Sequence, residues 1–189
     1  MKNILKVFVI TAGLVLFLNA DSFALVDASL YSGYVWKRNS GVDSDFNGLQ
    51  IGIKGHYNTQ LVPLLELGAG LYSQSATIRY GSFMKGRGDK LERTTSGFDV
   101  NFLLTTPVIH PYLRGTWAFY DKIKVNHKTE KKSFQTCGLG GGIELGAPFL
   151  RVFGEYMYEA SKHKFPNRTA GTSMNVNLKE LLFGIKINI

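Results

Sequence analysis

The sequence has a single cysteine, Cys137, among its 189 residues, and an internal disulfide is therefore excluded. Beyond the first 24 residues it also lacks an apolar run long enough for a membrane-spanning helix, which needs about 20 residues. The four histidines are scattered, and no pair of them has the spacing of a metal site. We therefore expect no metal and no cofactor.

The first 24 residues have the pattern of a cleaved secretory signal peptide. Lys2 and Lys6 give a basic start, an apolar run covers residues 7–18, and the small residues of 22–24 have the spacing of a cleavage site. This apolar run is too short to span a bilayer as a helix. No cysteine follows the cleavage point, so a lipoprotein anchor is not expected there. We expect residues 25–189 to form one domain.

From Val26 to Ile189 the chain repeats one pattern eight times, with apolar residues at every second position and turn residues between the copies. In the clearest copy, every second residue from Phe183 to Ile189 is apolar. Because successive side chains of a strand point to opposite faces, each copy predicts a strand with one apolar face. The expected strands cover residues 26–36, 46–57, 64–80, 96–105, 110–120, 134–145, 149–160 and 174–189.

The opposite face of these strands carries four bases and four acids. They are Lys54, Glu66, Asp99, Arg114, Glu144, Arg151, Glu155 and Lys186. A soluble sheet would place such charges in water, whereas a membrane barrel places them inside and its apolar face in lipid. Outward aromatics at strand ends, such as Trp36, Phe119 and Tyr158, are typical of membrane interfaces. They favour the membrane barrel over a soluble lipocalin-like barrel, which also has eight strands.

The connections between the expected strands alternate in length. Residues 58–63, 106–109 and 146–148 are short connections, and residues 37–45, 81–95, 121–133 and 161–173 are long and polar. Small bacterial barrels have short turns on the periplasmic side and longer loops outside. An open sheet would leave two unpaired edges, which lipid does not tolerate. We therefore predict an all-β fold: a closed, eight-stranded, antiparallel up-and-down transmembrane β-barrel with both termini in the periplasm.

Two local features modify this pattern. In the last strand, Val176 and Leu178 have the opposite parity to Phe183 and its successors, so we expect either a bulge near 179–182 or a pairing that has already left the membrane. Glycines gather at 138–142 without the helix and the Lys-Ser/Thr pair that a phosphate-binding loop requires. We expect these glycines to make room for neighbouring side chains such as Tyr72 or Arg114.

The interior charges suggest a plug. An eight-stranded barrel is only wide enough inside for its own side chains. Buried charges must then pair, because an isolated one costs several kcal/mol. Four bases against four acids favour a neutral, mutually paired plug. The alternative is a narrow, porin-like channel that selects ions.

The long connections hold the positive charge. Residues 25–189 contain 20 bases and 13 acids, and the four long connections account for the whole excess. The basic rim comprises Lys85, Arg87, Lys128, Lys131, Lys132, Lys162, Lys164 and Arg168. Such a rim attracts the phosphates of lipopolysaccharide or other polyanions of the host or environment. The simpler alternative is a solvated rim among anionic headgroups. Nucleic acid is not expected as a partner at the cell surface.

One grouping allows an enzymatic alternative. Glu159, Ser161 and His163 share one face at the top of the seventh expected strand, where a nucleophile, a base and an orienting acid could converge. The grouping is superficially similar to that of lipid A deacylases, which carry a His-x-Ser pair in this region. Here the order is Ser-Lys-His. A lipid A-modifying hydrolase is therefore a second hypothesis.

Residues 25–189 resemble the small outer-membrane barrels of Gram-negative bacteria, of the OmpA transmembrane-domain and opacity-protein type. The resemblance rests on Gly-Gly-Gly-Ile-Glu-Leu-Gly at 140–146, on Gly-Glu-Tyr-Met-Tyr-Glu at 154–159 and on the last strand. Phe183, Gly184, Ile187 and Ile189 look like the terminal signal for the β-barrel assembly machinery, although the family usually closes with an aromatic residue. The resemblance implies an exported barrel of the outer membrane, and its motifs specify a superfamily rather than a function. Our leading hypothesis is a non-enzymatic, monomeric barrel with a structural or adhesin-like surface role.

Overall fold

The computed structural model describes residues 25–37, 45–62, 64–81, 89–106, 108–125, 128–130, 135–147, 149–164 and 173–189. The expected signal peptide at 1–24 lies outside these ranges. Within them, no helix is long and apolar enough to cross a membrane.

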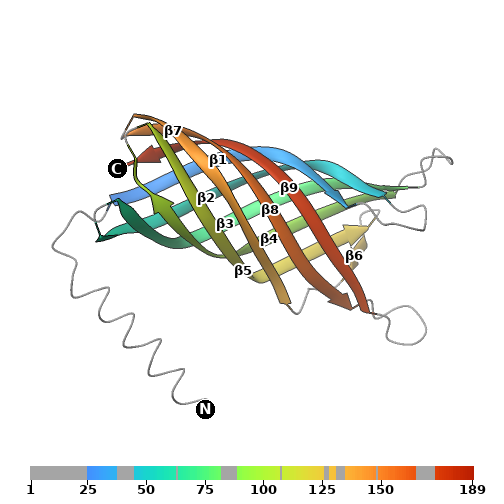
Figure 1. Ribbon diagram of the computed structural model, residues 1–189. Coiled ribbons are helices and arrows are strands. Elements are labelled where there is room, and N and C mark those ends of the chain that lie inside the picture. Colours follow the sequence, from blue (N-terminus) through green and yellow to red (C-terminus); the bar gives the residue numbers. More distant parts are fainter. Residues whose placement is uncertain are drawn as a thin grey trace, which may run out of the picture.

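The described residues form β-strands joined in sequence order (Figure 1). The strands are β1 (Leu25–Lys37), β2 (Asp45–Val62), β3 (Leu65–Gly81), β4 (Asp89–Leu104), β5 (Ile109–Val125), β6 (Lys128–Glu130), β7 (Gln135–Ala147), β8 (Leu150–Lys164) and β9 (Ser173–Asn188). Every pairing is antiparallel, β9 pairs with β1, and β4 pairs with β5, so all strands except β6 close into one cylinder. The three-residue β6 pairs only with the last residues of β5, Ile123 to Val125, and is not part of the closed wall. The predicted closed, eight-stranded, up-and-down barrel is confirmed.

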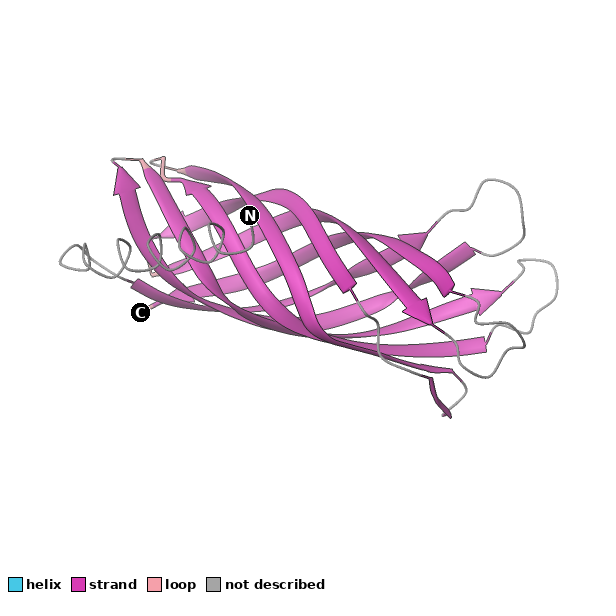
Figure 2. Ribbon diagram, turned by 90° about the horizontal axis from the view of Figure 1, so that it is seen from below, coloured by secondary structure: helices cyan, strands magenta, loops and turns pink. Residues whose placement is uncertain are grey.

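The pairing register defines the stagger of the barrel. Followed once around the wall from Val26, ladder partners run through Tyr57, Ala69, Val100, Gly115, Leu139, Tyr158 and Lys179 and return to β1 at Trp36. The path thus returns ten residues further along β1. This stagger accounts for the strong tilt of the strands in Figure 2. A barrel of this size has an interior that side chains can fill.

The short connections lie at the same end of the barrel as Leu25 and Ile189. Two backbone hydrogen bonds between Val26 and Ile189 hold the first and last strands together there. We call this the short-turn end and the opposite one the long-loop end. Two strands run further towards the long-loop end than the sequence pattern predicted: β4 begins at Asp89 rather than 96, and β5 continues to Val125 rather than 120. Charged and hydroxyl side chains interrupt the apolar alternation there, but backbone pairing does not depend on them.

The outer face of the wall is apolar and the inner face is largely polar, as the alternation predicted. Leu49 and Leu139 are each 70% exposed, and exposed apolar side chains continue along all eight wall strands. Charged residues of the same strands, such as Asp99 and Arg114, are almost completely buried. This inversion of a soluble core fits a wall that faces lipid.

The bulge expected near 179–182 is wrong. The ladder between β8 and β9 runs without a shift from Leu150↔Ile187 to Lys164↔Ser173. Leu178 keeps its parity and points inward, where it packs with Val35, Ala76 and Ile78. The parity conflict arises because the inner face becomes apolar near the long-loop end. Register shifts occur instead in β2–β3, between Gln60 and Val62, and in β4–β5, between Ser96 and Gly97.

The glycines of β7 make room inside, but for other side chains than expected. A Cβ at Gly140 would overlap Met157, and one at Gly142 would approach the hydroxyl end of Tyr112. Neither Tyr72 nor Arg114 is among the atoms that these positions would meet first. The glycines therefore allow the inner aromatic and methionine side chains to lie against the wall.

Candidate functional site

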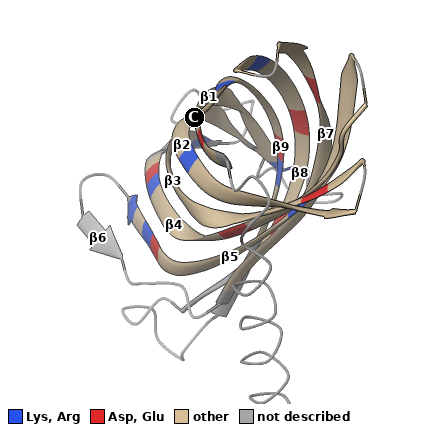
Figure 3. Cartoon of the chain, turned by 90° about the vertical axis from the view of Figure 1, so that its left-hand side faces the viewer, with Lys and Arg blue, Asp and Glu red and all other residues tan. Residues whose placement is uncertain are grey.

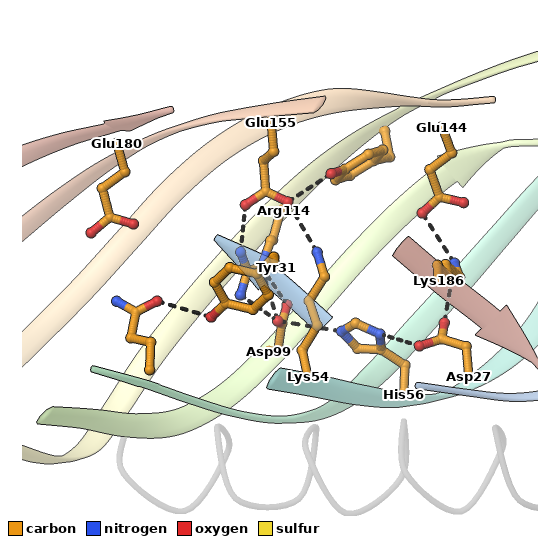
Figure 4. A network of polar contacts seen from close by, with 12 residues as sticks. Asp27, Tyr31, Lys54, His56, Asp99, Arg114, Glu144, Glu155, Glu180 and Lys186 are labelled. Atoms are coloured by element: carbon orange, nitrogen blue, oxygen red, sulfur yellow. Dashed lines mark hydrogen bonds and ion pairs between the residues drawn. The ribbon is translucent and has the colours of Figure 1, made fainter. Parts of the chain in front are cut away.

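A network of ion pairs and hydrogen bonds occupies the barrel interior, and its part nearest the short-turn end is the lower layer (Figure 4). Lys186 Nζ lies 3.1 Å from both Asp27 Oδ2 and Glu144 Oε1. Arg151 donates to the other oxygen of Glu144 at 3.1 Å. Asp27 also pairs with His56 Nδ1 at 2.9 Å. Strands β1, β2, β7, β8 and β9 are thus connected across the interior.

The middle layer is centred on Arg114. Its Nε donates to Asp99 at 3.0 and 2.9 Å, and its Nη1 pairs with Glu155. Lys54 Nζ lies 3.0 Å from the same Glu155, which also accepts a hydrogen bond from Tyr112 at 2.6 Å. His56 Nε2 lies 3.3 Å from Asp99 Oδ2 and so joins this layer to the lower one. The carboxylates of this layer each serve more than one donor.

The upper layer lies nearer the long-loop end. Arg93 donates to both oxygens of Asp121, at 2.9 and 2.6 Å, and pairs with Glu159. Glu180 accepts a hydrogen bond from Gln50 at 2.9 Å. Gln74 connects the layers, because it accepts from Tyr31 at 3.0 Å and donates towards Glu159 at 3.5 Å.

Aromatic and aliphatic side chains fill the space between the charges. The ammonium of Lys54 lies 4.4 Å from the ring centre of Phe153, and the guanidinium of Arg114 lies 5.7 Å from that of Tyr72. Such placements stabilise the cations beyond their ion pairs. One inner cluster comprises Tyr31, Leu103, Tyr112, Phe153, Met157 and Leu182. A second comprises Val35, Ala76, Ile78 and Leu178 with Leu91 beside it, and we call it the apolar cap.

The described part of the interior holds seven acids and five lysines or arginines, with His56 between two of the acids, rather than four acids and four bases. Among the described residues, the buried bases are Lys54, Arg93, Arg114, Arg151 and Lys186, and the buried acids are Asp27, Asp99, Asp121, Glu144, Glu155, Glu159 and Glu180. Glu66, expected in the network, is only half-buried. Sequence parity missed Asp27 and Glu180 because their strands alternate less clearly, and Arg93 and Asp121 because they were assigned to loops. Figure 3 shows acidic and basic positions around the wall.

The interior count changes where the positive charge lies. Removing five bases and seven acids from residues 25–189 leaves 15 bases and six acids. Each of the 15 bases falls in a long connection or in the strand ends beside it. Among those whose side chains are described, Arg79 and Lys179 are exposed on the outer face, and Lys37, Lys122 and Lys124 are half-buried. The end of the barrel with the long connections is therefore strongly basic.

The predicted basic rim falls almost wholly outside the described side chains. Lys85, Arg87, Lys131, Lys132 and Arg168 lie outside the described residues, and for Lys128, Lys162 and Lys164 only the backbone is described. Lys128 begins β6, and Lys162 and Lys164 lie at the end of β8, whereas the other five belong to the segments that join β3 to β4, β6 to β7 and β8 to β9. Their role stays a prediction.

The hypothetical catalytic grouping points into the barrel. Glu159 and Ser161 are both buried on the inner face of β8. The carboxylate of Glu159 pairs with Arg93. The side chain of His163 lies outside the described residues. A nucleophile at Ser161 would thus face the packed interior rather than the lipid around the wall.

Three residues of the expected assembly signal lie on the closing strand, β9, and the fourth, Ile189, follows its last residue. Phe183, Ile187 and Ile189 are exposed on its outer face. Gly184 is their inward-facing neighbour, and a Cβ there would overlap the ring of Phe153. Their arrangement leaves an apolar outer edge on the strand that pairs with β1.

Comparison with known proteins identifies the architecture. No protein-family model matches the sequence, and no characterised protein sequence matches it. The crystal structure of Neisserial surface protein A is similar, with a TM-score of 0.56 and 15% identity, and the match covers 86% of this chain and 96% of that one. This chain has the fold of the small outer-membrane β-barrels. The outer membrane protein OprG from Pseudomonas aeruginosa also matches this barrel, with a TM-score of 0.52, 8% identity and coverage of 88% of this chain and 97% of OprG.

Proposed function

We propose that the protein is a non-enzymatic barrel of the bacterial outer membrane whose basic long-loop end contacts anionic partners at the cell surface. The observation that carries the proposal is the filled interior. Ion pairs and aromatic side chains connect the strands across the interior, and the apolar cap packs above them. With the interior committed to packing, the long connections are the part of the chain left to meet partners.

The packed interior argues against the channel. In the middle layer, Lys54 and Arg114 are held between carboxylates and rings. Mobile ions would have to break these pairs, and each buried charge left alone costs several kcal/mol. The apolar cap adds a layer that offers ions no polar contact. We expect planar-bilayer conductance to stay at baseline for the wild type and for Glu155→Ala.

The same geometry argues against the lipid hydrolase. Ser161 is buried on the inner face, and Glu159 is engaged by Arg93 instead of being free to orient a histidine. An acyl chain in the outer leaflet would meet the outer face of the wall, whereas Ser161 faces inward. We expect the mass spectrum of lipid A to be the same with the wild type, with Ser161→Ala and without the protein. A mass change that depends on Ser161 would establish the enzyme.

Location follows the same reasoning. The apolar band suits a bilayer, and the alternation of short and long connections suits a barrel whose termini face the periplasm. We propose export through a cleaved signal at 1–24 and insertion by the β-barrel assembly machinery through β9. We expect a monomer, because the closed wall has no free strand edge among its eight strands.

The partner class follows from charge. All 15 remaining bases and five of the six remaining acids lie near the long-loop end, because only Glu66 lies at the short-turn end. Such a surface attracts lipopolysaccharide phosphates and sulfated glycans. Retention of the folded protein on a heparin column, compared with a variant in which Lys128, Lys131 and Lys132 are replaced by glutamine, tests this. We expect the variant to elute at lower salt. If both proteins elute at the same salt concentration and both are recovered in the outer-membrane fraction, the contact with anionic partners is wrong and only the structural role remains.

A further inference from the structure

Lys179 is an exposed base on the outer face of β9, at the upper edge of the apolar band. Below it on the same face lie Leu181, Phe183, Ile185, Ile187 and Ile189, all exposed. From Lys179 to its end at Asn188 the strand has 10 residues, which matches the roughly 9–11 residues of a tilted strand that crosses a bilayer. Lys179 therefore lies at the depth of the headgroups on the long-loop side.

Four aromatic residues surround this lysine. Its ladder partners are Trp36 on β1 and Tyr158 on β8. Two residues nearer the short-turn end on the same face, Leu181 has Tyr34 and Tyr156 as its ladder partners. The Trp36 ring stacks on Tyr34 with centroids 5.9 Å apart and lies 6.1 Å from Tyr156. We call the group of Lys179, Tyr34, Trp36, Tyr156 and Tyr158 the Lys179 site.

The donors of the Lys179 site suit a phosphate. An ammonium, three phenol hydroxyls and an indole N–H can all donate hydrogen bonds, and phosphate oxygens are strong acceptors. The described parts of β1, β8 and β9 carry their acids on the inner face, where Asp27, Glu155, Glu159 and Glu180 are buried. No outward carboxylate of these described strands therefore competes with an anion for Lys179.

Among the bases whose side chains the structure describes, the other outward ones lack this setting. Arg79 on β3 has Asn47 as its ladder partner on β2, and Lys122 on β5 has Thr94 on β4. A solvated lysine at a membrane boundary needs only to extend towards water. The aromatic residues on both sides of Lys179 add rigid walls and directed donors at the depth where a lipid phosphate lies. Arg79 is thus a natural control.

We propose that the Lys179 site binds a phosphate of lipid A, the membrane anchor of lipopolysaccharide, in the outer leaflet. The proposal rests on the proposed outer-membrane location with the long connections outward. That orientation places Lys179 in the leaflet that contains lipopolysaccharide. The lysine pairs with the phosphate, while the tyrosine hydroxyls and the indole N–H fix its position.

Native mass spectrometry of the folded protein in detergent micelles tests the proposal. The protein is titrated with diphosphorylated lipid A, with lipid A lacking its phosphates and with phosphatidylglycerol. We expect diphosphorylated lipid A to bind best. Loss of one charge-assisted contact, in Lys179→Ala or in the lipid without phosphates, should weaken binding on the order of tenfold. Lys179→Arg should bind as the wild type does, and the control Arg79→Ala, which removes a base outside the Lys179 site, should weaken binding much less than Lys179→Ala.

Folding of each variant is checked by its faster gel migration before heating. Equal lipid A affinity of Lys179→Ala and the wild type would overturn the proposal, as would phosphatidylglycerol binding as tightly as lipid A. Membrane fractionation separates this failure from a failure of the proposed function. If the protein is recovered in the outer membrane without binding lipid A, only the Lys179 site is wrong, whereas recovery in the soluble periplasm would remove both.

Discussion

Arg114 on β5 and Asp99 on β4 are bound to each other inside the barrel, with Nε donating to both carboxylate oxygens at 3.0 and 2.9 Å and Nη2 lying 2.7 Å from Oδ2. Both residues are buried. Arg114 also reaches Glu155 on β8, which lies beyond β7 along the wall. Arg114 therefore connects β4 and β5 with β8, a strand that neither of them touches edge to edge, and the interior contributes to the cohesion of the wall.

Replacement of Arg114 by alanine should strongly destabilise the barrel. It would leave Asp99 and Glu155 without their main cation, and breaking a buried pair costs about 3–5 kcal/mol. Lys54 still reaches Glu155, so the loss falls mainly on Asp99. Urea unfolding in detergent, followed by tryptophan fluorescence, measures the change in the free energy of unfolding.

The matched control for Arg114→Ala is Arg79→Ala. Arg79 is a base on the outer face of β3 and is exposed. Its replacement should leave the unfolding midpoint close to that of the wild type. If both variants unfold alike, the interior pairs contribute no more than solvated charges do.

The sequence was sufficient for the architecture because period-two alternation reports directly on which face of a strand meets lipid. Leu49, Leu139 and Ile185 fall on the outer face as expected. Alternation also located Lys54, Arg114 and Glu155 inside. It could not show that these three residues meet, since their contact depends on the stagger of the barrel, which only the register reveals.

The rest of the interior was hidden where alternation weakens. Near the long-loop end the outer face turns polar, and the inner face carries the apolar cap as well as the ion pair of Arg93 and Asp121. Leu178 then suggested a bulge, and Arg93 and Asp121 resembled loop residues. Both effects have one cause: strands that continue beyond the lipid no longer need an apolar outer face, although their backbones still pair.

The salt concentration should affect the solvated bases of the long-loop end and the buried ion pairs of the interior differently. Raising the salt concentration from about 0.05 M to about 0.5 M shortens the screening length several-fold, which weakens solvated charges far more than buried ones. We expect the protein to leave a heparin column within this range, while its unfolding midpoint changes little. A midpoint that falls in parallel with heparin retention would show that the interior pairs are exposed to solvent.

The apolar cap should contribute to stability like a small core. Leu178 is buried against Val35 and Ile78. Leu178→Ala leaves a cavity there and should cost about 2–5 kcal/mol. Leu49→Ala is the control, because Leu49 is 70% exposed on the outer wall and its removal opens no cavity. An equal loss of stability in both variants would mean that the cap is not packed.

Two glycines give the sharpest contrast between the inner and the outer face of the wall. A Cβ at Gly52 on β2 would overlap the ring of Tyr31, whereas a Cβ at Gly115 on β5 would meet nothing within 4 Å. Gly52→Ala should therefore force Tyr31 from its place and cost about 1–3 kcal/mol by overpacking, while Gly115→Ala should leave stability unchanged or raise it slightly. Urea unfolding of both variants measures this.

Shortening the neighbour in Gly52→Ala/Tyr31→Val should recover part of the loss, because the new methyl group then occupies space that the ring vacates. If the double variant is less stable than Gly52→Ala, the hydrogen bond from Tyr31 to Gln74 matters more than the close packing at Gly52.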